Sequence, residues 1–327
     1  SVAAPDRWSE HFTFRPGDAG RLAEERPARG LHPMIARRLR FWRLNNFETT
    51  RLPSPEDTYL FACRVADDPS DERLVALAEV RSLTEVRDEN GDLTSLPELE
   101  HTLTACLESI RQAQTERPRN RRLMANHVLL YVWPAVTFPL PELTAVARRL
   151  APMTEGLGME DVVMSVTMAE ADGTPLGEVS LSFSYRPGAG VTVGVQDGPA
   201  QALARTESYG QKVLNARRRG TVYPFELAKL LAGTGGTFTE LDFAEDGTLK
   251  PVDRPPGENT AGIVVGLAST PTVKHPEGMV RVVLMGDPTK SLGSVAEPEC
   301  SRICAALDLA EEMRVPLEWF ALSSGAR

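Results

Sequence analysis

Small residues follow two predicted apolar strands near the C-terminal end of the sequence. They are Gly293 and Ser294 after the first strand, and Gly325 and Ala326 after the second. Small side chains let backbone N–H groups approach a ligand closely, and converging N–H groups stabilise an oxyanion. The spacing predicts a ligand site at these four residues. It is equally consistent with two tight turns that only redirect the chain.

Other residue types give weaker indications of chemistry. Cys300 and Cys304 lie one helical turn apart, but zinc needs two further ligands and no Cys or His pair follows at suitable spacing. We therefore predict that both cysteines are buried in packing, and we predict no metal site. Ser323 and Ser324 precede a glycine but lack the Gly-x-Ser-x-Gly pattern of a hydrolase nucleophile.

Composition limits the class of protein. The chain has 327 residues, enough for two domains, with 42% hydrophobic and 25% charged residues. A formal net charge of −9 disfavours general nucleic-acid binding. The sequence has no run of about 18 apolar residues, no visible signal peptide and no disulfide-type cysteine pattern, so we expect a cytoplasmic protein without a membrane partner.

The first part of the chain predicts an α+β module. Apolar periodicity and turn signals separate about six strands, with helices packed on one face of the sheet. The expected strands are 58–65, 72–86, 127–138, 162–170, 177–185 and 191–195, and the expected long helices begin at Pro97 and Pro141.

An earlier helix, expected at 33–45, has an arginine-rich face. Ile35, Leu39 and Trp42 recur at helical spacing and should face inward. The opposite face carries Arg37, Arg38, Arg40 and Arg43. The acidic total favours a solvated face, and contact with a phosphate or nucleic acid is the alternative.

The character of the sequence changes near residues 217–220. We predict a domain at 1–218, a linker helix with a glycine-rich segment at 219–236, and a second domain at 237–327. The second domain should begin with an acidic surface stretch at 240–253. Its remaining pattern predicts two strands, a helix and a third strand, which is one ββα layer followed by the next strand; the ranges are 261–268, 280–286, 299–314 and 317–321.

Several segments resemble the biotin-dependent acyl-CoA carboxylases, in particular the single-polypeptide acetyl-CoA carboxylases. The similarity is strong from residue 255 onward, where it rests on residues 256–264, 282–289, 293–294 and 324–327. Before that point it rests on residues 11–15, 31–47 and 220–227 and on the helix near Cys106.

The resemblance implies a role for each domain. Residues 1–218 would be the last part of a non-catalytic central region, which positions the catalytic domains. Residues 237–327 would begin a carboxyltransferase domain with a crotonase-like fold. Such a ligase serves fatty acid biosynthesis by transferring a carboxyl group from carboxybiotin to an acyl-CoA, with malonyl-CoA-type products.

The resemblance also implies cofactors and partners. Biotin would sit on a carrier domain outside this chain, and ATP and Mg would bind only in the biotin carboxylase domain of the multidomain parent. The expected partners are acyl-CoA, those two domains, and a second copy of the chain through the carboxyltransferase, as a homodimer or higher homo-oligomer.

A further implication is that the sequence is a fragment whose carboxyltransferase domain is truncated at Arg327, so that the fragment alone is inactive. Two alternatives remain open. The chain can be a stand-alone structural or interaction module, or a crotonase-type CoA enzyme such as a hydratase. The acyl chain length that the parent accepts is left open as well.

Arg327 is the catalytic residue that the resemblance indicates. The family carries an arginine in the same Ser-Gly-Ala-Arg turn, where it is associated with the carboxylate being transferred. A planar guanidinium binds a carboxylate through two parallel hydrogen bonds, and lysine cannot reproduce that geometry. The alternative is an arginine that only caps the strand or meets solvent.

Overall fold

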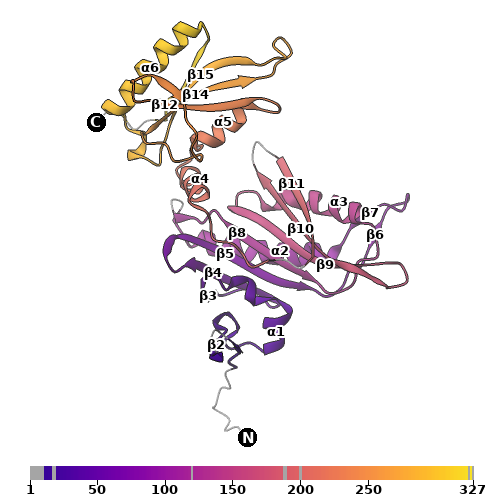
Figure 1. The fold of residues 1–327 in the computed structure, drawn as a ribbon. Coiled ribbons are helices and arrows are strands. Elements are labelled where there is room, and N and C mark those ends of the chain that lie inside the picture. Colours follow the sequence, from indigo (N-terminus) through magenta and orange to yellow (C-terminus); the bar gives the residue numbers. More distant parts are fainter. Residues whose placement is uncertain are drawn as a thin grey trace, which may run out of the picture. The chain divides into compact units, whose positions relative to one another are not determined.

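The computed structural model describes residues 11–16, 20–118, 121–186, 190–198, 201–322 and 325. The chain divides into two compact units, Ser1–Arg205 and Thr206–Arg327. Each unit combines helices with its own main sheet (Figure 1). The mixed α+β class predicted from the sequence is confirmed.

A seven-stranded sheet forms the first unit, in the order β11-β10-β9-β8-β5-β4-β3. The pairs β5–β8 and β8–β9 are parallel, and the other pairs are antiparallel. The strand that the sequence does not predict is β3, because its polar residues form the sheet edge. The strands are β3 (Glu48–Leu52), β4 (Thr58–Val65), β5 (Asp68–Val80), β8 (Asn126–Val132), β9 (Met159–Ala169), β10 (Pro175–Arg186) and β11 (Gly190–Asp197).

Two long helices cover one face of this sheet, α2 (Pro97–Thr115) and α3 (Leu140–Leu150) (Figure 1). Each has a proline in its first turn, where the missing N–H leaves no helical hydrogen bond unmade. The apolar stripes predicted for both helices are buried in the largest core, as the sequence indicates. They comprise Leu99, Leu103, Cys106, Leu107 and Ile110 of α2 and Leu143, Val146, Ala147 and Leu150 of α3.

The opposite face of the sheet packs against α1 (Pro33–Arg38) and the short helix η3 (Phe41–Leu44). Arg40 has a φ of +49°, so the helix predicted at 33–45 breaks in two. The prediction of a solvated arginine face is wrong at Arg43. Its side chain is buried, and its Nε donates to the Gln201 carbonyl oxygen at 2.8 Å.

A five-stranded sheet forms the second unit, in the order β13-β12-β14-β15-β16. The strands β15 and β16 are parallel and are joined by α6. This order confirms the predicted succession of two strands, a helix and a third strand. The elements are β12 (Thr237–Phe243), β13 (Leu249–Pro251), β14 (Ile263–Thr270), β15 (Met279–Gly286), α6 (Glu297–Met313) and β16 (Leu317–Phe320).

The boundary between the units falls earlier in the chain than the predicted position at 218. The helix α4 (Ser208–Arg218) packs with α5 (Pro224–Ala232) against β14 and β15 in one core of the second unit. Lys212 of α4 also donates to the Gly257 carbonyl oxygen at 2.5 Å. The segment predicted as a linker at 219–236 therefore contains a core helix, because the apolar face of α5 is buried against the sheet.

The acidic stretch predicted on the surface at 240–253 is partly buried. Glu240 and Asp242 lie on β12 and are 9% and 6% exposed. Arg302 donates from its Nε to Asp242 at 2.8 Å, and Arg254 forms ion pairs with both carboxylates. These arginines are distant in sequence, so the local run of acidic residues does not reveal the pairing.

The remaining elements are short. Two small antiparallel sheets pair β1 (Phe14–Pro16) with β2 (Leu22–Glu24) and β6 (Val86–Arg87) with β7 (Leu93–Ser95). Single-turn helices are η2 (Arg26–Ala28), η5 (Ala151–Thr154) and η6 (Ser291–Gly293). Among the described residues, no helix combines the length and the apolar character needed to cross a bilayer.

Candidate functional site

The ends of β15 and β16 bring the two predicted ligand-binding segments together. The strands run in parallel, so their C-terminal ends lie at the same edge of the sheet. Gly286 ends β15, and a Cβ placed there would lie only 2.6 Å from the Leu322 carbonyl oxygen. Beyond the strands, the Val295 N–H donates to the Gly325 carbonyl oxygen at 2.9 Å. The loop carrying Gly293 and Ser294 is therefore a direct neighbour of Gly325.

Asp287 organises the loop that follows β15. Its side chain is fully buried, and its carboxylate accepts hydrogen bonds from the Thr289 N–H at 2.9 Å and the Thr289 hydroxyl at 2.6 Å. The Asn259 amide donates to the other carboxylate oxygen at 2.9 Å. These bonds hold the strand exit against the segment that leads into β14.

Glu299 fixes the start of α6 beside the same loop. Its carboxylate accepts from the Gly262 N–H at 2.8 Å and from the Ala296 N–H at 2.9 Å. The second bond satisfies an unpaired donor at the helix N-terminus, where a negative charge is also favourable. The sequence does not reveal the roles of Asp287, Asn259 and Glu299, because their partners are distant in sequence or are backbone groups.

The loop itself is held in an unusual backbone conformation. Ser291 and Leu292 have φ values of +46° and +56°, and Gly293 continues the left-handed turn at +71°. Such a conformation costs about 1–3 kcal/mol for a residue other than glycine, and it persists where neighbouring contacts hold it. Here the bonds to Asp287 and Gly325 supply those contacts.

The donors available at this site differ from those expected. The N–H groups of Gly293 and Ser294 already donate within the turn, to the carbonyl oxygens of Lys290 at 2.8 Å and Ser291 at 3.0 Å. The Ser294 hydroxyl is buried and has no hydrogen-bond partner within the described part of the chain. The Ser294 hydroxyl is therefore the polar group of this loop that has no hydrogen-bond partner among the described residues.

The other sequence candidates lie elsewhere or outside the structure. Ala326, Arg327, Ser323 and Ser324 lie outside the described residues. Cys300 and Cys304 are exposed, so the prediction of their burial is wrong. The face of α6 that packs on the sheet uses Ala306 and Ala310 instead. Across the described residues, no group of three or more His, Cys, Asp or Glu side chains is arranged to hold a metal ion.

Comparison with known proteins gives partial matches. No family model matches the chain. It is 31% identical to an acetyl-CoA carboxylase of Schizosaccharomyces pombe over 126 residues. This alignment covers 38% of this chain and 5% of that protein. It is 37% identical over 94 residues to acetyl-CoA carboxylase 1 of Oryza sativa subsp. japonica, over 27% of this chain and 4% of that protein.

Among solved structures, the chain aligns with the central domain of yeast acetyl-CoA carboxylase. The TM-score is 0.43 at 14% identity, over 62% of this chain and 28% of the other. The sequence matches confirm the resemblance to the acetyl-CoA carboxylases, and the chain spans only 4–5% of the length of these two relatives.

Proposed function

We propose that this chain is part of a biotin-dependent acetyl-CoA carboxylase. The first unit acts as a scaffold of the central region and positions the catalytic domains. The second unit is the beginning of a carboxyltransferase domain with a crotonase-like fold. In this account the parent enzyme works in the cytoplasm and produces malonyl-CoA for fatty acid biosynthesis.

The observation that carries the proposal is the sequence shared with acetyl-CoA carboxylases, at 31% identity over 126 residues. The second unit supports it, because two antiparallel strands, a crossover helix and a parallel third strand are the start of a ββα repeat. The hydrogen-bonded loop at the exits of β15 and β16 lies in the part of the chain where the motif resemblance is strong.

We propose that the residues at the exits of β15 and β16 contact acyl-CoA and carboxybiotin. Biotin on its carrier domain supplies the carboxyl group. In this chain the buried Ser294 hydroxyl could donate to a carbonyl oxygen of the ligand, since it has no hydrogen-bond partner among the described residues. Asp287 and Glu299 keep that hydroxyl in place by fixing the loop and the start of α6.

The remaining partners belong to the parent enzyme. We expect ATP and Mg to bind its biotin carboxylase domain and a second copy to complete the carboxyltransferase. Because one wall of the catalytic site would then come from elsewhere, the 327-residue chain alone should not decarboxylate malonyl-CoA in the presence of free biotin.

Radiolabelled bicarbonate fixation tests the proposal on the natural polypeptide that contains this chain. We expect incorporation of label into an acid-stable product that requires ATP, Mg and acetyl-CoA and is blocked by avidin. The 327-residue chain serves as the matched negative control. Fixation that is independent of acetyl-CoA, or no fixation by a polypeptide shown to carry biotin, would contradict the proposal.

A further inference from the structure

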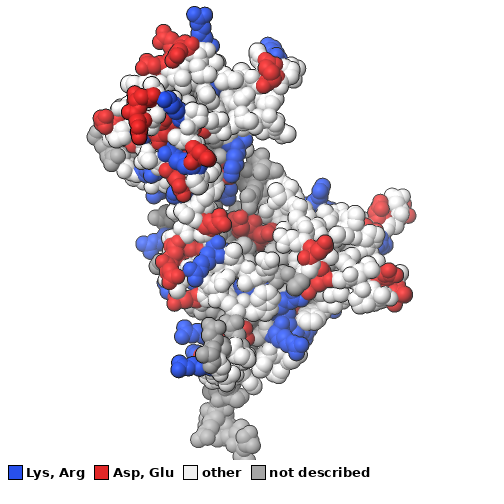
Figure 2. Space-filling model, in the orientation of Figure 1, with Lys and Arg blue, Asp and Glu red and all other residues white. Residues whose placement is uncertain are grey.

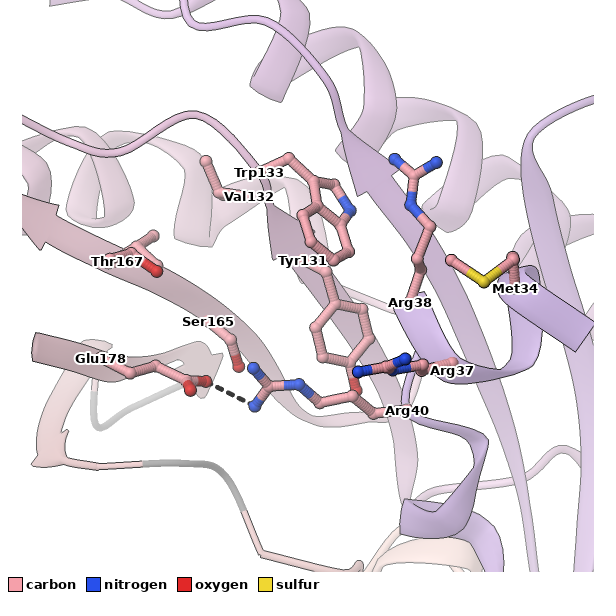
Figure 3. Close-up of a pocket in the computed structure, with 11 residues that line it drawn as sticks. Met34, Arg37, Arg38, Arg40, Tyr131, Val132, Trp133, Ser165, Thr167 and Glu178 are labelled. Carbon is pink, nitrogen blue, oxygen red and sulfur yellow. Dashed lines mark ion pairs between the residues drawn. The ribbon is translucent and has the colours of Figure 1, made fainter.

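A cavity lies in the first unit, on the sheet face that carries α1. Its volume is about 670 Å³, within the range of small-ligand pockets. One wall is α1 with the turn that follows it, and the floor is formed by β8, β9 and β10 (Figure 3). Lys and Arg side chains gather on the surface where α1 lies (Figure 2). The cavity is independent of the site at the exits of β15 and β16.

Three arginines line this cavity, and two of them are held in place. Arg38 pairs with Glu79 at 2.9 Å and lies 4.7 Å from the centre of the Trp133 ring. Arg40 pairs with Glu178 at 2.5 Å and lies 5.5 Å from the Tyr131 ring centre (Figure 3). Guanidinium groups oriented by a carboxylate and an aromatic face lose little freedom when they bind a further anion.

The third arginine, Arg37, is exposed and forms no ion pair within the described part of the chain. Its position follows from the backbone, because α1 ends at Arg38 and the left-handed Arg40 redirects the chain. Arg37 and Arg38 therefore reach the cavity from α1, and Arg40 reaches it from the turn that follows.

Two hydroxyl groups on the cavity floor, those of Ser165 and Tyr131, are buried. Ser165 on β9 lines the cavity and is 4% exposed, and its hydroxyl has no hydrogen bond within the described residues. Tyr131 on the neighbouring strand β8 is 3% exposed, and its hydroxyl lies close to Arg43 but makes no hydrogen bond of normal geometry among the described residues. An unpaired buried hydroxyl destabilises the protein, and a bound ligand oxygen would supply the missing hydrogen bond.

The rim of the cavity is apolar. Trp133 is 48% exposed and Met34 is 50% exposed, and both side chains border the opening (Figure 3). Exposed aromatic and thioether groups beside a basic floor suit a ligand that has a flat or apolar body next to its charge. A free carboxylate alone would make no use of these exposed apolar groups.

We propose that this cavity binds a phosphate-bearing small molecule of mononucleotide size. The phosphate lies between Arg37 and Arg40 and accepts the hydrogen bond of the Ser165 hydroxyl. The organic part rests against Trp133 and Met34. A phosphate group fits because it brings up to about two negative charges and three acceptor oxygens to a site that presents several donors.

Isothermal titration calorimetry of the 327-residue chain tests this proposal with three probes: ADP, inorganic phosphate and adenosine. We expect ADP to bind and to weaken as salt is added, since the contacts are charged. Adenosine should bind far more weakly than ADP. Binding of inorganic phosphate as tight as that of ADP would identify the free anion as the ligand and would overturn the contact proposed between an organic body and Trp133 and Met34.

Matched variants locate the binding. Arg37→Ala should weaken ADP binding about tenfold or more, the effect of one lost charge-assisted hydrogen bond, without changing the circular dichroism spectrum, because this side chain is exposed. Ser165→Ala should weaken it about threefold or more on the same scale. Arg148→Ala, an exposed change on α3, should have no effect. The proposal is overturned if ADP does not bind, if adenosine binds as tightly as ADP, or if Arg37→Ala and Arg148→Ala bind ADP equally.

Discussion

His127 is a buried titratable residue in the first unit, beside a buried ion pair. Its Nε2 lies 3.4 Å from Nη1 of Arg73, which pairs with Asp71 at 2.5 Å. Burial, and then the positive charge of Arg73, lowers the pKa of His127 from 6.5 to about 3. Between these two pH values the unfolded chain binds a proton that the folded chain does not. The free energy of unfolding should therefore decrease as the pH falls from about 6.5 toward about 3.

The variant His127→Gln tests this effect. It should reduce the pH dependence of the free energy of unfolding by up to about 1.4 kcal/mol per pH unit, whatever it does to stability at neutral pH. Urea denaturation at a series of pH values measures that slope. His101→Gln, an exposed change on α2, is the control and should leave the slope unchanged. Equal slopes for the parent and His127→Gln would show that His127 is not the group responsible.

Arg327 carries the catalytic prediction that the resemblance suggests. In the natural polypeptide, Arg327→Lys should keep the fold but lose about 2 kcal/mol or more of transition-state stabilisation, on the scale of one charged donor. The measurement is kcat/KM for acetyl-CoA carboxylation. Arg314→Lys, an exposed change just after α6, is a matched control. If the Arg327→Lys variant carboxylated acetyl-CoA at nearly the parent rate, Arg327 would not have the catalytic role proposed for it.

At the scale of elements, β12 is tied to α6 through a buried carboxylate. Burial alone would raise the pKa of Asp242, but hydrogen bonds from the Phe243 N–H and from Arg302 and Arg254 outweigh it, and the pKa is lowered overall. A lowered pKa means that the carboxylate stabilises the fold above its unfolded pKa and that this stability is lost as the pH falls.

Asp242→Asn should therefore destabilise the second unit at neutral pH by about 3 kcal/mol, the typical effect of breaking a buried ion pair, and should weaken its acid sensitivity. Thermal or urea unfolding measures both effects. The matched control is Asp246→Asn, which removes an exposed pair with Lys250 and should have little effect. If both variants were equally stable, the buried network would not anchor β12 to α6.

Much of the element structure is readable from the sequence because it depends on local periodicity. The strand β4 and the helix α2 begin where the sequence predicts, since a proline or a turn marks each start. The exposure of Cys300 and Cys304 is not readable, because α6 has apolar or small residues on more than one face. The helix expected at 33–45 fails for a different reason: the left-handed conformation of Arg40 is imposed by the core formed around Phe41.

The candidate site was predicted only in outline. The small residues at the strand exits indicate that two turns meet, but hydrogen bonding decides which groups remain available. The N–H groups of Gly293 and Ser294 are used inside the turn, and that depends on the left-handed backbone of Ser291 and Leu292. Serine and leucine rarely adopt a left-handed conformation, so the sequence does not predict this turn. The availability of the Ser294 hydroxyl is therefore seen only in the structure.

At the scale of the whole molecule, the two compact units have separate cores and should unfold as separate transitions. Leu103→Ala in α2 should lower the melting temperature of one transition, and Leu284→Ala in β15 that of the other. Each substitution removes a fully buried leucine and should cost about 2–5 kcal/mol. Differential scanning calorimetry is the measurement. A single transition that both variants shift equally would mean that the chain unfolds as one unit.

We propose that the exits of β15 and β16 contribute to carboxyl transfer on acetyl-CoA. A cryo-EM structure of the natural polypeptide with acetyl-CoA bound tests it most directly. We predict that the thioester lies beside the loop containing Gly293 and Ser294, within hydrogen-bonding distance of the Ser294 hydroxyl, next to Gly325 and Arg327. Acetyl-CoA bound at a site remote from this loop, with the Ser294 hydroxyl still unpaired, would contradict the claim.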